Sequence, residues 1–306
     1  MSKCNTLLKN LVWLWAISAV TCGDKKGIVL IARRIRFLFR ALVVYRSLRP
    51  MIDAPGESSL GKLMRDRPQT VGAIIWPYQC ASWKAFTRLA RIRDHYAVIE
   101  KIGGAIDFPV DGQIFLLDLG DICEGYYVLV DQPEWFMREG QLAINLFLGD
   151  ARMYTLAFSF FHRGNAIAAC VGAIQGRDIE GALEKYRELT KASHGMRPRD
   201  FLIEVFRMFC AELGVAEIFA VSDQYRHHRD PYFGQASANK CSANYDEVWT
   251  DRGGVRVDPM FYKLGVIEPE RDLATVPSKK RGMYRRRFEM LQCIRDQMHH
   301  RWAALK

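Results

Sequence analysis

The stretch RMYTLAFSFFHRGNAIAACVGAIQG, residues 152–176, contains two long apolar runs separated by a Gly-Asn pair. Two such runs with a short Gly- and Asn-containing connection are typical of antiparallel strands joined by a hairpin. Three more runs with short connections precede this stretch, at residues 113–120, 125–131 and 140–150. The sequence therefore predicts an antiparallel meander of about five strands.

Helical periodicity follows the meander. It predicts helices over 177–193 and 199–214, and Gly214 stands where a helix C-cap favours glycine. A buried strand, 215–222, comes next, and we expect it to lie beside the 165–176 strand through a crossover connection. A short helix within 242–254, a strand within 258–266 and a long basic helix over 281–306 complete the chain. The pattern predicts an α+β fold with a mostly antiparallel central sheet covered by helices.

The composition is that of a globular protein. The 306 residues are 49% hydrophobic and 25% charged, which excludes a mainly disordered chain. Eight cysteines are scattered singly, without a C-x-x-C pair, and several lie in apolar runs. This spacing indicates reduced, mostly buried thiols and excludes a disulfide framework and a cysteine-rich zinc site, so we expect a cytoplasmic protein without a metal site.

Positive charge is concentrated at the two ends of the chain. Of the net charge of +10, residues 1–50 carry +9 and residues 279–306 carry +7, which leaves −6 for the body. Basic ends fit attraction to an anionic membrane surface, and the alternative is two solvated helical faces. Nucleic acid is a weaker expectation because no nucleic-acid-binding motif accompanies the charge. The expected location is the cytoplasm, peripheral on the inner membrane.

Two apolar segments lie near the N-terminus. Residues 10–22 are too short to cross a bilayer and form either a signal segment or a packed or membrane-lying helix. Residues 27–46 form an amphipathic helix with Arg33, Arg36 and Arg40 opposite an apolar face, which either packs on the domain, the reading we favour, or lies on a membrane. With a linker at 49–61, the sequence predicts an N-terminal helical region, 1–62, and an α+β core domain, 63–306.

Several motifs together resemble one bacterial family. The segments EGQLAINL, YTLAFSF, VGAIQGRD, SHGMRPRDFLIE, NYDEVW and KKRGMYRRRFEML occur in order along the chain. They resemble the VirK/YbjX family, a likeness that runs from about residue 30 to residue 295. The resemblance implies a role in envelope integrity, virulence and tolerance of antimicrobial peptides in Gram-negative bacteria. It assigns no catalytic residue.

A second, partial resemblance bears on chemistry. The order strand, turn, helix and strand around SHGMRPRD, residues 193–200, is similar to the core of the GCN5-related N-acyltransferases, in which such a turn grips a diphosphate. The resemblance implies an acyl-CoA cofactor at this turn, with Gly195 and Gln175 as candidate contacts, and a catalytic role for Tyr262, from the segment MFYKLGV. The residues themselves add Arg197 and Arg199, basic side chains at a helix N-terminus that suit a bound anion, and His194 as a candidate general base, because the unperturbed pKa of histidine suits proton transfer at neutral pH.

Each of these sites has a structural alternative. Asp200 and Glu204 can neutralise the two arginines locally, which would make SHGMRPRD an ordinary turn. His227, His228 and Asp230 follow a buried strand, where we expect a solvated loop rather than a metal site. The sequence therefore leaves two functions open: an acyltransferase-like enzyme, or a non-catalytic adaptor or chaperone-like protein that binds anionic lipid or an envelope component.

Overall fold

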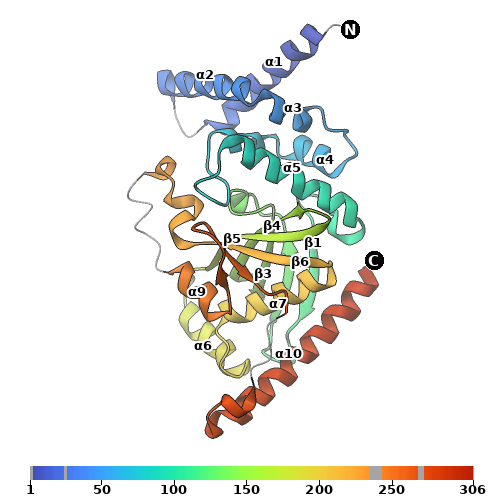
Figure 1. Cartoon of the computed structure of the whole chain (residues 1–306), viewed down its shortest axis with the longest axis vertical. Helices are drawn as coiled ribbons and strands as arrows, with labels where there is room; N and C mark the ends of the chain where they lie inside the picture. The colour runs from blue at the N-terminus through green and yellow to red at the C-terminus, as the bar shows by residue number, and fades with distance from the viewer. Residues whose placement is uncertain (1–2, 24–25, 235–242, 268–271, 306) are drawn as a thin grey trace.

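The computed structural model describes residues 3–23, 26–234, 243–267 and 272–305, and within these its centre is an eight-stranded sheet (Figure 1). The strand order is β1-β2-β3-β4-β5-β6-β8-β7. The strands are β1 (Gln113–Asp118), β2 (Tyr126–Asp131), β3 (Leu142–Leu148), β4 (Ala151–Arg163), β5 (Ala166–Gly176), β6 (Val215–Val221), β7 (Val255–Arg256) and β8 (Phe261–Leu264).

The pairing confirms the predicted meander. Strands β1 to β5 pair in sequence order, each antiparallel to the next. Strand β6 pairs with β5 in parallel, as expected for the crossover, and β8 lies antiparallel between β6 and β7. The two-residue strand β7 was not predicted, because two exposed residues are too few to show the alternation of apolar and polar residues that indicates a strand. The α+β class with a mostly antiparallel sheet is therefore confirmed.

Helices cover the sheet. In Figure 1, α5 lies along one side of the sheet, and α6, α7 and α10 lie on the other. The helices of the core are α5 (Ala85–Ile102), α6 (Ala182–Ala192), α7 (Pro198–Glu212), α9 (Tyr245–Asp251) and α10 (Ser278–Leu305). Helix α10 packs on α7 and β1 through Met290, Ile294, Met298 and Trp302, which recur every four residues and are all buried.

Helix α5 also completes the hydrogen bonding of β4. Pairing of β3 with β4 ends at Phe158, so the last residues of β4 extend beyond β3. The Phe160 amide donates to His95 Nδ1 at 3.0 Å, and the His162 amide donates to Asp94 Oδ2 at 2.9 Å. Two side chains of one helix thus satisfy backbone groups that the neighbouring strand does not reach.

The N-terminal region is helical nearly throughout. It comprises α1 (Lys3–Thr21), α2 (Gly27–Val43), α3 (Tyr45–Ile52) and α4 (Ser59–Asp66). The predicted linker at 49–61 is wrong in extent, because α3 continues past Pro50 and Ser58 caps α4 by accepting from the Gly61 amide at 3.0 Å. Leu14, Phe37 and Ala41 join the same hydrophobic core cluster as the sheet.

Six cysteines, those whose side chains the structure describes, are free thiols, as predicted. Five of them, Cys22, Cys80, Cys123, Cys170 and Cys210, are buried, and Cys293 on α10 is exposed. Burial raises the pKa of Cys170 to about 12. Such a thiol stays protonated and unreactive, which fits structural cysteines. The predicted thiol at Cys241 lies outside the described residues.

Candidate functional site

The turn between α6 and α7 contains the residues in which the sequence predicted an anion site. Ser193 Oγ donates to Leu189 O at 2.6 Å and to Met196 O at 2.9 Å, and the Gly195 amide donates to Thr190 O at 2.7 Å. His194 and Gly195 both have positive φ, 52° and 83°. Local hydrogen bonds thus hold the turn tightly, and its conformation favours glycine at position 195.

The C-terminal helix approaches this turn closely. The His194 carbonyl accepts from Arg287 of α10, at 2.7 Å from Nη2 and 3.2 Å from Nε. A Cβ atom at position 195 would stand 3.2 Å from Arg287 Nη2 and 3.3 Å from Met283 Sδ. The absence of a side chain at Gly195 therefore lets α10 approach the turn.

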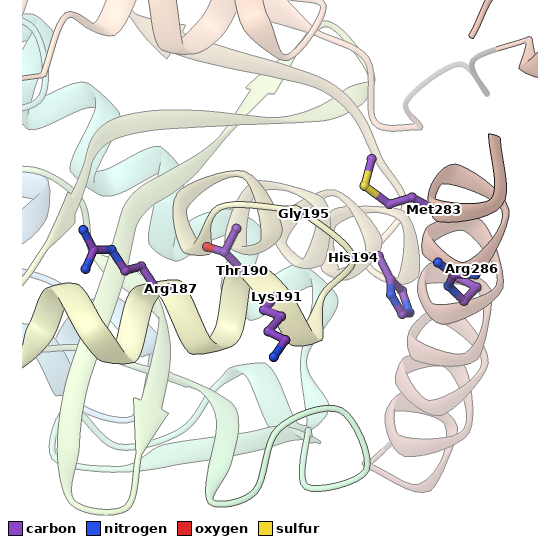
Figure 2. A pocket seen from close by; sticks show the side chains of 7 residues that line it. All are labelled: Arg187, Thr190, Lys191, His194, Gly195, Met283 and Arg286. Carbon is purple, nitrogen blue, oxygen red and sulfur yellow. The ribbon is translucent and has the colours of Figure 1, made fainter. Parts of the chain in front are cut away.

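A shallow cavity of about 460 Å³ opens beside the turn (Figure 2). Its lining comes from α6, the turn and α10: Arg187, Thr190, Lys191, His194, Gly195, Met283 and Arg286. Three of these side chains are cationic and none is acidic, although Arg187 also pairs with Glu184 at 3.2 Å. His194 and Gly195 thus lie together at a basic surface that suits an anion.

Arg197 and Arg199 are engaged elsewhere. Arg197 Nε lies 2.8 Å from Asp200 Oδ2, and Arg199 Nη2 lies 2.9 Å from Asp200 Oδ1. Both arginines also approach Asp251 of α9, at 3.3 and 3.6 Å. Asp200 is only 5% exposed and lies in the first turn of α7, where a negative charge is favourable. The carboxylates of Asp200 and Asp251 together therefore balance the charge of the two arginines. Asp200 was expected in this role, whereas Glu204 pairs with Arg207 instead.

Gln175 and Tyr262 lie away from the turn's cavity. Gln175 is exposed near the end of β5, opposite Thr155 of β4. Tyr262 is 7% exposed on β8, opposite Ala220 of β6. Neither residue lines the cavity that holds His194.

Strands β5 and β6 separate toward one end, and residues of α9 fill the wedge-shaped space between them. Pairing of these strands ends at Val171 and Ala220, after which they separate. The Tyr245 hydroxyl accepts from the Ile174 amide at 2.8 Å and donates to the Ile174 carbonyl at 2.9 Å, and Trp249 Nε1 donates to Val221 O at 2.8 Å. Burial raises the pKa of Tyr245 to about 12. The backbone groups that the separation exposes are thus satisfied within the chain.

The segment after β6 is not a solvated loop, so that prediction is wrong. His227 is 6% exposed, with Nε2 at 3.2 Å from Glu139 Oε1. Burial and neighbouring arginines lower the pKa of His228 to about 3. In the described part of the chain, no group of three or more His, Cys, Asp or Glu side chains is placed to hold a metal ion.

The clearest feature missed by the sequence analysis is an exposed apolar surface on α1 and α2. Twelve of the twenty exposed large apolar side chains in the described residues lie on these two helices. They are Leu7, Leu8, Val12, Trp15 and Val20 of α1 and Ile28, Val29, Ile31, Ile35, Phe39, Leu42 and Val43 of α2. We call this set the α1–α2 apolar surface.

Helix α2 packs by a different face from the one expected. Its buried residues are Phe37 and Ala41, and Arg34 points into the helix pair, where Nε donates to Ser18 Oγ at 2.9 Å and the guanidinium lies 3.8 Å from the Trp15 ring centroid. Ile31 and Ile35 are more than half exposed. The prediction that this apolar face packs on the domain is therefore wrong. No helix within the described ranges is long and apolar enough to span a bilayer.

Comparison with known proteins identifies relatives of the chain, but the descriptions of these relatives do not assign an enzymatic activity. A family model described as a protein of unknown function (DUF535) matches residues 28–300. An uncharacterized protein of Escherichia coli, YbjX, is 27% identical over 87% of this chain and 82% of its own length. An uncharacterized Haemophilus influenzae protein is 32% identical over 52% of this chain and 51% of its own. A membrane protein of Mannheimia haemolytica, LapB, is 32% identical over 20% of this chain and 27% of its own. No solved structure matches the chain.

Proposed function

The chain belongs to the DUF535 family, which includes YbjX-like proteins of unknown function, and from that premise we propose that it is a peripheral protein of the bacterial envelope. In this proposal the α1–α2 apolar surface lies in the interface of an anionic membrane. The short match to a protein named as a membrane protein supports an envelope-related role.

The observation that carries the proposal is the α1–α2 apolar surface itself. Exposed apolar side chains scattered singly are ordinary on a soluble protein, whereas a row of them along one helix face marks an interaction surface. Ile28 is 84% exposed, Val43 71% and Phe39 67%, and all three belong to one helix that also carries four arginines. Apolar residues on one face with flanking basic residues are the composition of helices that lie in a membrane interface.

Vesicle flotation tests this function. We expect the protein to float with vesicles that contain phosphatidylglycerol, and we expect Ile35→Glu with Phe39→Glu to reduce binding about tenfold or more, because each large apolar side chain contributes roughly 1.5–3 kcal/mol when buried. The matched control is Leu183→Glu with Val255→Glu, which places two charges at exposed apolar positions on α6 and β7. Equal binding by both double variants, or no binding by the wild type, would contradict the proposal.

A second candidate function is acyl-CoA-dependent acyl transfer. It is favoured by the topology, in which the parallel pair β5–β6 is connected through α6 and α7, and by the basic cavity beside His194 and Gly195. In this candidate the cavity's own cations, Lys191 and Arg286, bind the anionic end of the carrier, since Arg197 and Arg199 are held by Asp200. Tyr245 fills the wedge beside β5, which argues against entry of the carrier along that strand.

Thermal denaturation with acetyl-CoA and with a long-chain acyl-CoA tests this candidate. Ligand at 100 times its dissociation constant stabilises the folded state by about 2.7 kcal/mol, so we expect a measurable rise in Tm. Lys191→Glu with Arg286→Glu should abolish the rise, whereas Lys280→Glu with Arg285→Glu, at exposed positions of α10 outside the cavity lining, should leave most of it. A lack of stabilisation at millimolar ligand would contradict an acyl-CoA enzyme.

A further inference from the structure

A second cavity, of about 410 Å³, lies beside the basic flank of α2. On one side it is lined by Arg33, Arg36 and Arg40, and on the other by Asp230, Pro231 and Tyr232. The two sides are far apart in the sequence, since the second follows β6 in the core. The cavity therefore forms only when the folded chain brings these two segments together. A run of basic residues along an exposed helix would not form such a cavity.

The cavity has an excess of positive charge. The side chains of Arg36 and Arg40 make no hydrogen bond or ion pair with any other residue that the structure describes. The one acidic lining residue, Asp230, is already engaged: its Oδ1 accepts from the Tyr232 amide at 2.8 Å, and its Oδ2 lies 3.9 Å from Nη2 of the mostly buried Arg88. Two guanidinium groups that line one cavity without carboxylate partners, as those of Arg36 and Arg40 do, favour a bound anion there.

The position of the arginines on α2 relates this cavity to a membrane. At 3.6 residues per turn, Arg33, Arg36 and Arg40 share a face of α2 that borders the exposed apolar face at Phe39, which lies about 60° from Arg36 around the helix. When the apolar face lies at the boundary of the acyl chains, the neighbouring face is at the depth of the lipid headgroups. Tyr232, which is 40% exposed at the cavity, is a residue type that prefers this depth.

We propose that this cavity binds the phosphate-bearing headgroup of an anionic phospholipid. The inference rests on the proposed membrane function and adds a lipid class to it. Arg36 and Arg40 contact the phosphate oxygens as donors, with Arg33 on the same flank. A membrane lipid is preferred over free phosphate because α2, which lines the cavity, also carries seven residues of the α1–α2 apolar surface, and that surface has no role in binding a small soluble anion.

Flotation of the full chain with vesicles of two compositions tests the inference. One set is phosphatidylcholine alone and the other contains one-third phosphatidylglycerol, both at about 0.1 M salt. We expect the wild type to prefer the anionic vesicles at least tenfold, because each basic residue near an anionic surface contributes about 1 kcal/mol. Arg36→Gln with Arg40→Gln should remove most of that preference and leave the weaker binding to neutral vesicles unchanged.

The matched control has the same net charge. Lys280→Gln with Arg285→Gln removes two cations from exposed positions of α10, at the other end of the molecule (Figure 1), and should change the preference less than twofold, since the Debye length is about 10 Å at this salt concentration. Far-ultraviolet circular dichroism checks that each variant is folded.

The outcomes separate the inference from the function on which it rests. Absence of binding to both vesicle types would overturn both. Binding without preference, or equal losses in the two double variants, would overturn the headgroup site alone. A rise in wild-type Tm with inorganic phosphate, without any preference between vesicles, would assign the cavity to a soluble anion and also overturn the inference.

Discussion

His95 shows how burial fixes the state of a single side chain. It is 1% exposed, its Nδ1 accepts from the Phe160 amide, and burial lowers its pKa from 6.5 to about 3. The imidazole is therefore neutral, with its proton on Nε2, throughout the physiological range. It stacks on Phe160 at 5.8 Å and meets Tyr96 edge-on at 4.9 Å between ring centroids. His95 is therefore a core residue whose ring accepts a hydrogen bond from the backbone of β4.

This pKa predicts a pH dependence of stability. The unfolded chain binds a proton at position 95 below about pH 6.5 and the folded chain does not until about pH 3, so the free energy of unfolding falls with decreasing pH in this window, by about 1.4 kcal/mol per unit. His95→Gln keeps an acceptor and removes the titration. Urea denaturation between pH 7.5 and 4.5 should show a shallower decline in this variant, and parallel curves for the two proteins would contradict the prediction.

At the scale of residues, the sequence could predict which side chains are close in the chain but not what they contact. Arg197 and Arg199 were expected to bind a ligand, and the adjacent Asp200 was recognised as the alternative partner. Asp251, which both arginines also approach, lies more than fifty positions later, on α9, and its role could not be predicted from the sequence. Arg287 likewise reaches His194 from a helix that begins at Ser278. Long-range partners depend on the fold, so residue roles were harder to predict than residue positions.

The turn between α6 and α7 joins three elements, because α10 packs against it. Gly195→Ala should lower stability by about 1–2 kcal/mol for the left-handed backbone, and by more because Arg287 and Met283 must move. Gly149→Ala is the control, since Gly149 has a φ of 52° and open space at its Cβ. Denaturant unfolding should show the larger loss for Gly195→Ala; equal losses would mean that α10 does not require the close approach.

At the scale of elements, the periodicity of apolar residues predicted the long strands and helices correctly. The five antiparallel strands, the parallel β6 and the helices α6, α7 and α10 follow from apolar spacing of 2 and 3.6 residues. Helix α2 was predicted as a helix but assigned the wrong buried face. The apolar residues of α2 extend over more than one face of the helix. The periodicity of apolar residues indicates which side of a helix is apolar, but it does not indicate whether another element covers that side.

At the scale of the whole molecule, the two basic ends of the chain lie far apart. Helices α1 and α2 are at one end of Figure 1, and the start of α10 is at the other. A flat membrane can therefore contact only one basic end closely, and we propose that this is the N-terminal end, because the α1–α2 apolar surface lies there. The sequence predicted both charge clusters, but their separation in space required the fold.

The account's central claim is that α2 enters the membrane interface, and an environment-sensitive fluorophore on α2 tests this most directly. With Cys4→Ser, Cys241→Ser and Cys293→Ser as background, Phe39→Cys is labelled in one sample and Leu183→Cys in another, both at exposed positions. On addition of vesicles containing phosphatidylglycerol, the account predicts a blue shift and quenching by bromine-labelled acyl chains at position 39 and neither effect at position 183. An unchanged spectrum at position 39 in the presence of bound vesicles, or the same change at both positions, would contradict it.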